Sequence, residues 1–129
     1  SLFLNKPYDM RRFLVLLLMA GLLISCTDSK KSIMPISELT SVDLESAVLL
    51  DVRTPEEFAE GHLQGAVNMD WYQEDFARQL EAIDKEDKVY VYCKKGGRSA
   101  EAAKLLDSLG YKNVVDLAGG YDAWLESRD

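Results

Sequence analysis

The sequence predicts a single α/β domain with a mostly parallel central sheet and helices on both faces of it. Short apolar runs at 48–52, 66–69, 89–92 and 114–117 are typical of buried strands. Between them lie stretches with helical spacing or helix-capping residues. Strands that alternate with helices favour parallel pairing, because each helix returns the chain to the same edge of the sheet. A length of 129 residues accommodates one such domain and not two.

The first strand and the helix after it are the most clearly marked pair. Strand 48–52 is apolar except for Asp51. Thr54 follows as an expected N-cap, Pro55 takes the first helical position, and Glu57 completes a capping box three residues after the cap. A helix is therefore predicted to begin at Pro55.

The later elements are predicted from spacing and composition. After the second strand a helix is expected over about 70–83, because large apolar residues recur near helical spacing at Trp71, Phe76, Leu80 and Ile83. Strand 89–92 is rich in β-branched and aromatic residues, which favour sheets. A helix over about 99–109, stopped by Gly110, and a short helix over about 121–127 lie on either side of the last strand.

The N-terminal quarter of the chain is typical of a secretory signal. Met10-Arg11-Arg12 precedes twelve apolar or small residues, Phe13 to Ile24, and Ser25-Cys26 ends the run. The run is shorter than the roughly 20 residues that a transmembrane helix needs. Its end resembles the lipobox of bacterial lipoproteins, in which the cysteine is acylated after cleavage. The alternative is an ordinary cysteine near a cleavage site.

These features predict three parts. Residues 1–26 form a signal peptide with Cys26 as the lipidation site, residues 27–34 a polar tether, and residues 35–129 the folded domain. Residues 1–9 precede the first methionine and are interpreted as an upstream extension or a cloning remnant. The protein is then expected in a bacterial cell envelope, facing the periplasm or the exterior. Only its N-terminal lipid anchor would hold it on the membrane.

Charge and cysteine content exclude several classes of function. Without residues 1–26 the chain keeps 12 basic and 21 acidic residues, a net charge of −9. Such a surface is unsuited to nucleic acid or to anionic lipid headgroups. Cys93 would then be the only thiol, which excludes an internal disulfide and a paired-cysteine redox motif. The sequence shows no cluster of metal ligands, so neither a metal nor another cofactor is expected.

Segment 93–99 (CKKGGRS) holds the residues expected to carry chemistry. It follows the strongest strand, and ligands of parallel sheets bind where strands end and helices begin. Cys93 is expected near a helix N-terminus, whose free N–H groups and dipole favour a thiolate. Lys94, Lys95 and Arg98 concentrate three positive charges in an otherwise acidic chain. The pattern indicates a nucleophile that acts on an anionic substrate.

The remaining residues of the segment are expected to shape it. Gly96 and Gly97 are predicted at positive φ, so that successive N–H groups point inward as an anion-binding nest. Ser99 is predicted to be the N-cap of the following helix. A strand-ending cysteine is more often an inert core residue. The combination of cysteine, glycines and cations favours the reactive interpretation over the inert one.

Four motifs in order resemble those of the single-domain rhodanese family: 51–58 (DVRTPEEF), 61–68 (GHLQGAVN), 93–99 (CKKGGRS) and 117–124 (LAGGYDAW). The resemblance implies a rhodanese-like fold and a thiosulfate sulfurtransferase. Cys93 would take a sulfane sulfur from a donor such as thiosulfate and pass it, as a persulfide, to a thiophilic acceptor. The residues of the loop from Lys94 to Ser99 would cradle this sulfur and bind the small anionic donor.

Residues outside the loop receive supporting roles from the same resemblance. Asp51 and Arg53 end a strand near the loop and are expected to brace it, with Arg53 also placed among the residues that contact substrate. His62 is the only histidine, which invites a triad interpretation. In the family its segment is a structural turn, so His62 is expected to be a hydrogen-bonded scaffold residue.

Two alternatives compete with a sulfurtransferase. Cysteine phosphatases use a C-x5-R loop, whereas Cys93 to Arg98 is C-x4-R and is one residue too small for a phosphate. The other alternative is a non-catalytic or carrier rhodanese module that binds persulfide sulfur or delivers it to a protein partner. Non-catalytic binding modules usually lack the cysteine or the glycines and cations of the loop. All of these are present here, which favours an active enzyme over a binding module, whereas an enzyme and a persulfide carrier would use the same residues.

Overall fold

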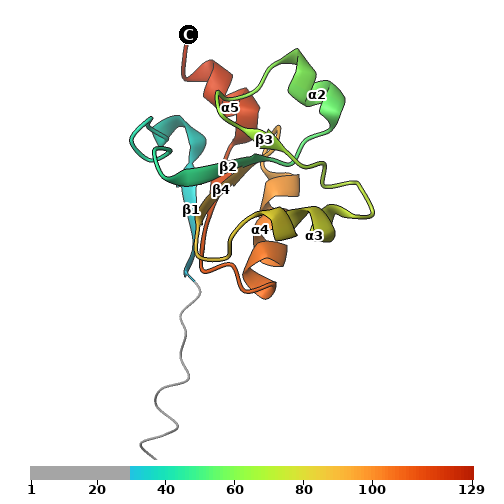
Figure 1. Cartoon of the computed structure of the whole chain (residues 1–129). Helices are drawn as coiled ribbons and strands as arrows, with labels where there is room; N and C mark the ends of the chain where they lie inside the picture. Colours follow the sequence, from blue (N-terminus) through green and yellow to red (C-terminus); the bar gives the residue numbers. More distant parts are fainter. Residues whose placement is uncertain (1–29) are drawn as a thin grey trace, which may run out of the picture.

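A computed structural model describes residues 30–129 (Figure 1). Within them, five parallel strands form one sheet in the order β1-β5-β4-β2-β3. The strands are β1 (Lys30–Pro35), β2 (Ala47–Asp51), β3 (Val67–Asn68), β4 (Lys88–Tyr92) and β5 (Asn113–Ala118). The predicted α/β class with a parallel sheet is confirmed.

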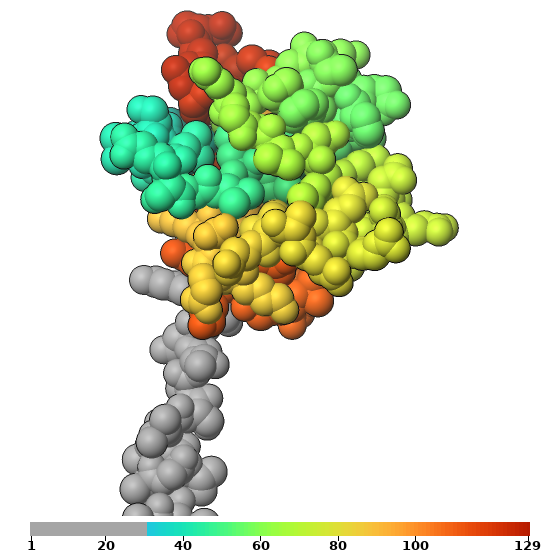
Figure 2. All heavy atoms as spheres, in the orientation of Figure 1, coloured from blue at the N-terminus to red at the C-terminus, as the bar shows by residue number. Residues whose placement is uncertain are grey.

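The helices cover both faces of this sheet, as predicted. They are α2 (Pro55–Glu60), α3 (Phe76–Gln79), α4 (Gly97–Ser108) and α5 (Gly120–Glu126), with the 3₁₀ turns η1 (Ile36–Glu38) and η2 (Leu80–Ala82). Side chains of α3, η2 and α4 join the core on one face, and those of η1 and α5 join the core on the other. Both α2 (green) and α5 (red) lie at the end of the molecule where β2 and β5 terminate (Figures 1 and 2).

Strand β4 shows how the sequence fills both cores. Val89 and Val91 point to the face covered by α4, and Tyr90 and Tyr92 point to the face covered by η1 and α5. All four side chains are buried, since neighbouring strands flank β4 on both sides. Burial of each contributes about 1.5–3 kcal/mol. The alternation therefore places β4, and the loop that follows it, at the rigid centre of the molecule.

Strand β1 corrects the predicted tether at 27–34. Residues 30–35 pair in parallel with β5, from Lys30 opposite Asn113 to Pro35 opposite Ala118. The segment is polar because β1 is an edge strand, in which Ile33 remains 69% exposed. Lysine at an edge also discourages further strand pairing. The tether prediction is wrong for residues 30–34, whereas the predicted signal and its Cys26 lie outside the described residues.

The helix predicted over 70–83 is also largely wrong. Only α3 and η2 are helical there, and residues 71–75 form turns. The carboxylate of Asp70 accepts a hydrogen bond from the Tyr72 N–H at 3.0 Å, and its carbonyl accepts one from the Gln73 N–H at 3.1 Å. Such local bonds compete with the helix. Phe76 and Leu80 are nevertheless buried, so their spacing predicted the buried face correctly.

The boundaries of the other helices are closer to prediction. The capping box of α2 is present, with Thr54 as N-cap, Pro55 as the first helical residue and Glu57 at the third position. Helix α4 ends at Ser108, and Gly110 follows it at a φ of 91°. This glycine conformation lets the N–H of Tyr111 donate to the Leu106 carbonyl at 3.1 Å, which closes the helix end.

Candidate active site

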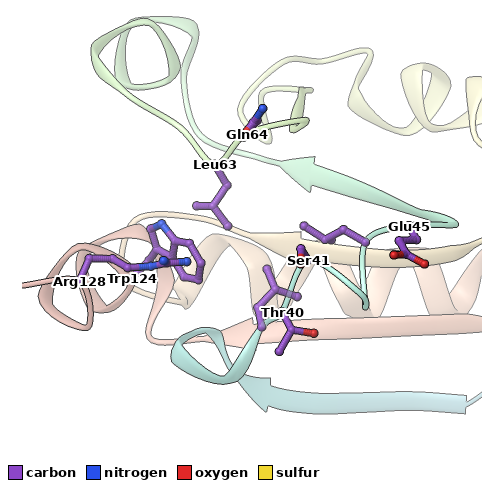
Figure 3. Close-up of a pocket in the computed structure, with 9 residues that line it drawn as sticks. Thr40, Ser41, Glu45, Leu63, Gln64, Trp124 and Arg128 are labelled. Atoms are coloured by element: carbon purple, nitrogen blue, oxygen red, sulfur yellow. The ribbon is translucent and has the colours of Figure 1, made fainter.

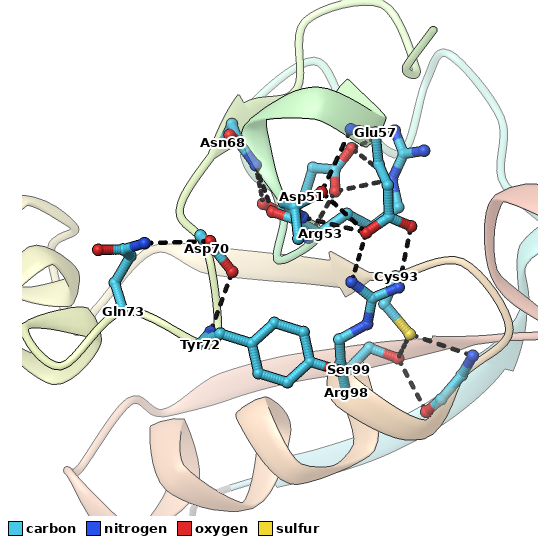
Figure 4. Close-up of polar contacts among 12 residues, drawn as sticks. Asp51, Arg53, Glu57, Asn68, Asp70, Tyr72, Gln73, Cys93, Arg98 and Ser99 are labelled. Atoms are coloured by element: carbon cyan, nitrogen blue, oxygen red, sulfur yellow. Dashed lines mark hydrogen bonds and ion pairs between the residues drawn. The ribbon is translucent and has the colours of Figure 1, made fainter. Parts of the chain in front are cut away.

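Cys93 lies at the carboxyl edge of the sheet, directly after β4, and is 1% exposed. The chain turns there and enters α4 at Gly97, four residues later (Figure 4). The sulfur accepts a hydrogen bond from the Gly96 N–H, with 3.1 Å between Sγ and N, and lies 3.6 Å from Oγ of Ser99. The loop backbone therefore folds around the sulfur atom.

A single glycine with positive φ makes this turn. Gly96 has a φ of 120° and is the N-cap of α4, whereas Gly97 is the first helical residue and has no positive φ. The prediction of positive φ is thus confirmed for Gly96 and wrong for Gly97. Because α4 begins two residues earlier than predicted, Ser99 is not the N-cap. It lies in the first turn, where its hydroxyl donates to the Gly96 carbonyl at 3.1 Å.

Helix α4 directs its N-terminus at the sulfur. The Ala100 N–H donates to the Gly96 carbonyl at 3.1 Å, and the N–H groups of 97–99 have no acceptor one turn earlier in the helix. These groups and the helix dipole concentrate positive charge at this end. An anion bonded to Sγ of Cys93 would lie against it. The arrangement suits negative charge on the sulfur or on an atom attached to it.

The three cations of the loop differ in how free they are. Lys94 and Lys95 are exposed, and within residues 30–129 neither has a carboxylate oxygen within 4.0 Å. Arg98 instead forms a two-pronged ion pair with Glu57 of α2 at 2.6 and 3.0 Å. The guanidinium of Arg98 also lies over the ring of Tyr72, with 5.6 Å between Cζ of Arg98 and the ring centre. Arg98 therefore ties α4 to α2, while the two lysines face solvent.

The ion pair also sets the ionisation of Glu57. Hydrogen bonds from Arg98 lower the pKa of Glu57 from 4.5 to about 2, and bonds from Thr54 act in the same direction against the effect of burial. The carboxylate is thus shared between the capping box and the loop arginine. One side chain therefore holds both the start of α2 and the first turn of α4 in place.

Replacing Glu57 with glutamine is expected to lower the free energy of unfolding by about 2 kcal/mol at neutral pH. Because the folded-state pKa of Glu57 is lowered, its stabilisation is complete above the unfolded value of 4.5 and is lost as the pH falls toward 2. Urea unfolding between pH 7 and pH 3 should show the difference between the two proteins shrinking below pH 4.5. Glu56→Gln, at an exposed neighbour, is the control. A difference that stays constant with pH would contradict this role.

Asp51 and Arg53 form a buried brace beside the loop. Asp51 is fully buried and Arg53 is 3% exposed, and their nearest charged atoms are 2.7 Å apart. Arg53 also donates to the Gly61 carbonyl at 2.7 Å and lies over the ring of Tyr121, 4.4 Å from its centre. Burial by itself would lower the pKa of Arg53, but the hydrogen bonds that Arg53 donates to Asp51 and the negative charge of Asp51 raise it overall. The groups that Arg53 contacts here, Asp51, the Gly61 carbonyl and the Tyr121 ring, hold its side chain in place within the fold.

His62 lies where a scaffold residue is expected. Its Nδ1 is 2.7 Å from the Phe58 carbonyl oxygen, and its ring stacks on that of Phe58 with 3.6 Å between ring centres. Nearby, the Leu63 N–H donates to the Tyr92 hydroxyl at 3.1 Å. His62 therefore belongs to the turn after α2, where both its hydrogen bond and its ring contact are with Phe58.

Backbone N–H groups at the start of α5 hold the start of the Cys93 loop through hydrogen bonds. The sequence analysis did not predict this contact. The Tyr121 N–H donates to the Cys93 carbonyl at 2.8 Å, and the Asp122 N–H donates to the Lys94 carbonyl at 3.1 Å. Gly120 precedes them with a φ of 67° and packs directly against the two carbonyl groups. The available signal in the sequence was the pair of glycines at 119–120, directly before the predicted helix over about 121–127.

Two cavities lie near this end of the molecule. One of about 410 Å³ adjoins the loop and is lined by Arg53, Glu57, Glu60, Gly61, Lys94, Tyr121, Asp122 and Leu125. It brings Arg53 and Lys94 to the same opening. The other, of about 500 Å³, has an apolar floor that includes Leu39, Leu63 and Trp124 (Figure 3). Of the two cavities, the first is the one lined by a residue of the loop, Lys94.

Residues 30–129 contain neither a cluster of metal ligands nor a membrane-spanning helix. No three histidine, cysteine, aspartate or glutamate side chains in this range gather in a way that would hold a metal ion. In the same range, no helix has the length and apolar character needed to cross a membrane.

Known proteins are similar to this chain in sequence and in fold. Thiosulfate sulfurtransferase 16, chloroplastic, from Arabidopsis thaliana is 39% identical over 88 residues, which are 60% of this chain and 73% of that protein. Thiosulfate sulfurtransferase GlpE from Pseudomonas entomophila is 36% identical over 81 residues, 62% of this chain and 72% of that protein. The chain spans only 20% of the adenylyltransferase and sulfurtransferase UBA4 of Candida albicans, at 39% identity over 90 residues and 64% of this chain.

The fold comparison agrees with the sequence comparison. A rhodanese-related protein from Thermoplasma volcanium superimposes with a TM-score of 0.65 at 28% identity, covering 75% of this chain and 92% of that protein. The family model of the rhodanese-like domain matches residues 39–127. The relatives of this chain include proteins named as sulfurtransferases. The chain therefore belongs to the rhodanese-like family.

Proposed function

We propose that the protein moves a sulfane sulfur from thiosulfate or a related anionic donor to a thiophilic acceptor, through a persulfide on Cys93. The observation that supports this most directly is the position of Sγ. It accepts the Gly96 N–H at 3.1 Å and lies at the N-terminus of α4. The relatives named as thiosulfate sulfurtransferases support the same donor class.

The reaction proceeds in two displacements. The Cys93 thiolate attacks the sulfane sulfur of the donor, the donor S–S bond breaks, and sulfite leaves with the bonding electron pair. The enzyme retains an anionic outer sulfur. A nucleophilic acceptor then attacks this sulfur, the persulfide S–S bond breaks, and the Cys93 thiolate is restored. The N–H groups at the start of α4 stabilise the negative charge on sulfur in both steps.

Lys94 and Lys95 are proposed to attract the dianionic donor. Replacing both with alanine is expected to raise the KM for thiosulfate several-fold at low salt, with a smaller effect as ionic strength rises. Lys104→Ala/Lys112→Ala removes the same charge from positions where the lysines pair with Glu101 and Glu86. This control should leave the KM for thiosulfate unchanged. An equal effect of both double variants would contradict a local role.

Initial-rate kinetics test the proposed function. Rates measured against donor concentration at several fixed concentrations of cyanide or a thiol should give parallel double-reciprocal lines, because sulfite leaves before the acceptor reacts. Intersecting lines would contradict a persulfide intermediate. Rates at background with every small acceptor would favour a carrier that delivers sulfur to a protein.

The N-terminal segment adds a proposal about location. We propose that Cys26 is acylated and anchors the domain to a membrane of the bacterial cell envelope, on the periplasmic or external side. The run from Phe13 to Ile24 and the residues around Cys26 support this. Fractionation of wild type and Cys26→Ser is the test, and a processed variant that stays in the membrane fraction would refute the proposal.

A further inference from the structure

Asp116 is a buried carboxylate for which the fold supplies no reason. It lies in β5, is 5% exposed, and occurs between the buried residues Val115 and Leu117. Its Oδ1 has no hydrogen-bond partner within the described residues. Burying a charged group without a partner is costly, and an apolar residue in the same place would avoid the cost. The position therefore calls for a role other than packing.

The geometry of the strand places Asp116 beneath the start of α4. Val114, two residues earlier, packs in the core shared with α4 and Cys93, and alternate residues of a strand share a face. In the sheet Asp116 lies opposite Val91 of β4, which belongs to the same core. From this face, the side chain of Asp116 is directed toward the first turn of α4.

The charged and polar groups that act on Asp116 come from two elements. Burial raises the pKa of Asp116, while hydrogen bonding by Ser99 of α4 and the positive charge of Lys31 of β1 lower it in part. From β4, Cys93 occupies the same core. Ser99 is therefore the polar neighbour that Asp116 shares with the candidate nucleophile.

Ser99 connects the two groups. It is fully buried, and the Cys93 thiol lies 3.6 Å from its Oγ with the geometry of a donor. The Ser99 hydroxyl proton is directed at the Gly96 carbonyl, 3.1 Å away. A serine hydroxyl can rotate between acceptors, and the Asp116 carboxylate, on which Ser99 acts by hydrogen bonding, is the second acceptor. Ser99 is therefore the hydroxyl that can connect the Asp116 carboxylate with the Cys93 thiol.

We propose that Asp116, acting through Ser99, stores the Cys93 proton while the enzyme carries sulfur. This rests on the proposed function. As the thiol passes its proton to Oγ of Ser99, the hydroxyl proton of Ser99 moves to the carboxylate of Asp116. The products are a Cys93 thiolate and a neutral carboxylic acid, and no proton enters or leaves the site.

This proton transfer keeps the total charge of Cys93 and Asp116, including any sulfur bound to Cys93, constant through the cycle. The resting pair is a neutral thiol with an ionised carboxylate, and the loaded pair is an anionic persulfide with a neutral acid. Both carry a single negative charge, which avoids two adjacent anions in a buried site. When the acceptor removes the outer sulfur, the S–S bond breaks with its electron pair on Cys93. The proton then returns through Ser99 to that sulfur.

Difference infrared spectroscopy of the whole protein tests this proposal. Spectra before and after addition of thiosulfate are compared, and the added sulfur is counted by intact mass in the same samples. The wild type should gain the C=O absorption of one protonated carboxyl group as it gains sulfur. Asp116→Asn and Ser99→Ala should gain sulfur without this band. Asp87→Asn, an exposed aspartate before β4, should behave as the wild type.

The steady-state rates provide a second readout. Asp116→Asn is expected to lower kcat by about 10- to 100-fold with little change in the KM for thiosulfate, because proton transfer and not donor binding is impaired. Sulfur uptake without a new carboxyl band in the wild type would refute the proton store alone. A band present before loading would refute it too, since the carboxyl would then be neutral at rest. Absence of any sulfur uptake would refute the proposed function and the store together.

Discussion

Replacing Gly120 with alanine should destabilise the protein by about 3–5 kcal/mol. The new side chain has no space, and the backbone at this position has a left-handed conformation that alanine rarely adopts. A Cβ at this position would lie 2.6 Å from the Cys93 carbonyl oxygen and closer still to the Lys94 carbonyl. The φ of 67° adds strain for any residue other than glycine. Thermal unfolding should shift down by at least about 12 °C.

Gly97→Ala is the matched control in the same part of the chain. A Cβ built on Gly97 meets no atom within 4 Å, and the residue lies in the first turn of α4 without a positive φ. The free energy of unfolding of this variant should stay constant or increase by up to about 1 kcal/mol. Its thermal midpoint should accordingly stay constant or rise. If Gly120→Ala were as stable as this control, α5 would not hold the loop through Gly120.

Cys93→Ser should reduce sulfur transfer to the background rate, a loss of about four orders of magnitude or more. A serine oxygen is a far weaker nucleophile toward sulfane sulfur and forms no stable sulfur adduct under these conditions. The fold should be retained, because a hydroxyl can accept the Gly96 N–H that now reaches Sγ at 3.1 Å. Circular dichroism and the thermal midpoint check the fold, and the rate of thiocyanate formation from thiosulfate and cyanide measures the activity.

A second variant separates loss of the nucleophile from loss of structure. Cys93→Ala removes the sulfur without adding a buried hydroxyl, and Cys93 is packed in the apolar core with Val91 and Ala102. The alanine variant should be as inactive as the serine variant. Substantial turnover in either folded variant would show that sulfur passes through another group.

Local sequence signals predicted the fold well where one segment determined its own structure. The capping box from Thr54 to Glu57 and the αL glycine at 110 are complete within a few residues, and both occur in the structure. The prediction of one helix over 70–83 was wrong because Asp70 accepts a short-range hydrogen bond from the Tyr72 N–H. This bond turns the chain before the apolar spacing can extend a helix. Strand β1 was missed because its partner, β5, is some 80 residues away and its own composition is polar.

The candidate site divides in the same way. The place of Cys93 at the end of a strand and the positive φ of Gly96 follow from seven consecutive residues and could be predicted from the sequence, whereas the start of α4 was predicted two residues too late. The pairing of Arg98 with Glu57 joins residues 41 positions apart, so the sequence could not distinguish a bound arginine from a free one. Asp116 carried no signal, because an aspartate in a strand reveals its burial only when the helix above it is placed.

Intact mass spectrometry before and after incubation with thiosulfate tests the role of Cys93 most directly. The wild-type chain should gain the mass of one sulfur atom and lose it on addition of cyanide, and Cys93→Ser should gain none. A wild-type protein that keeps a free, alkylatable Cys93 and gains no sulfur would contradict a thiosulfate-loaded persulfide.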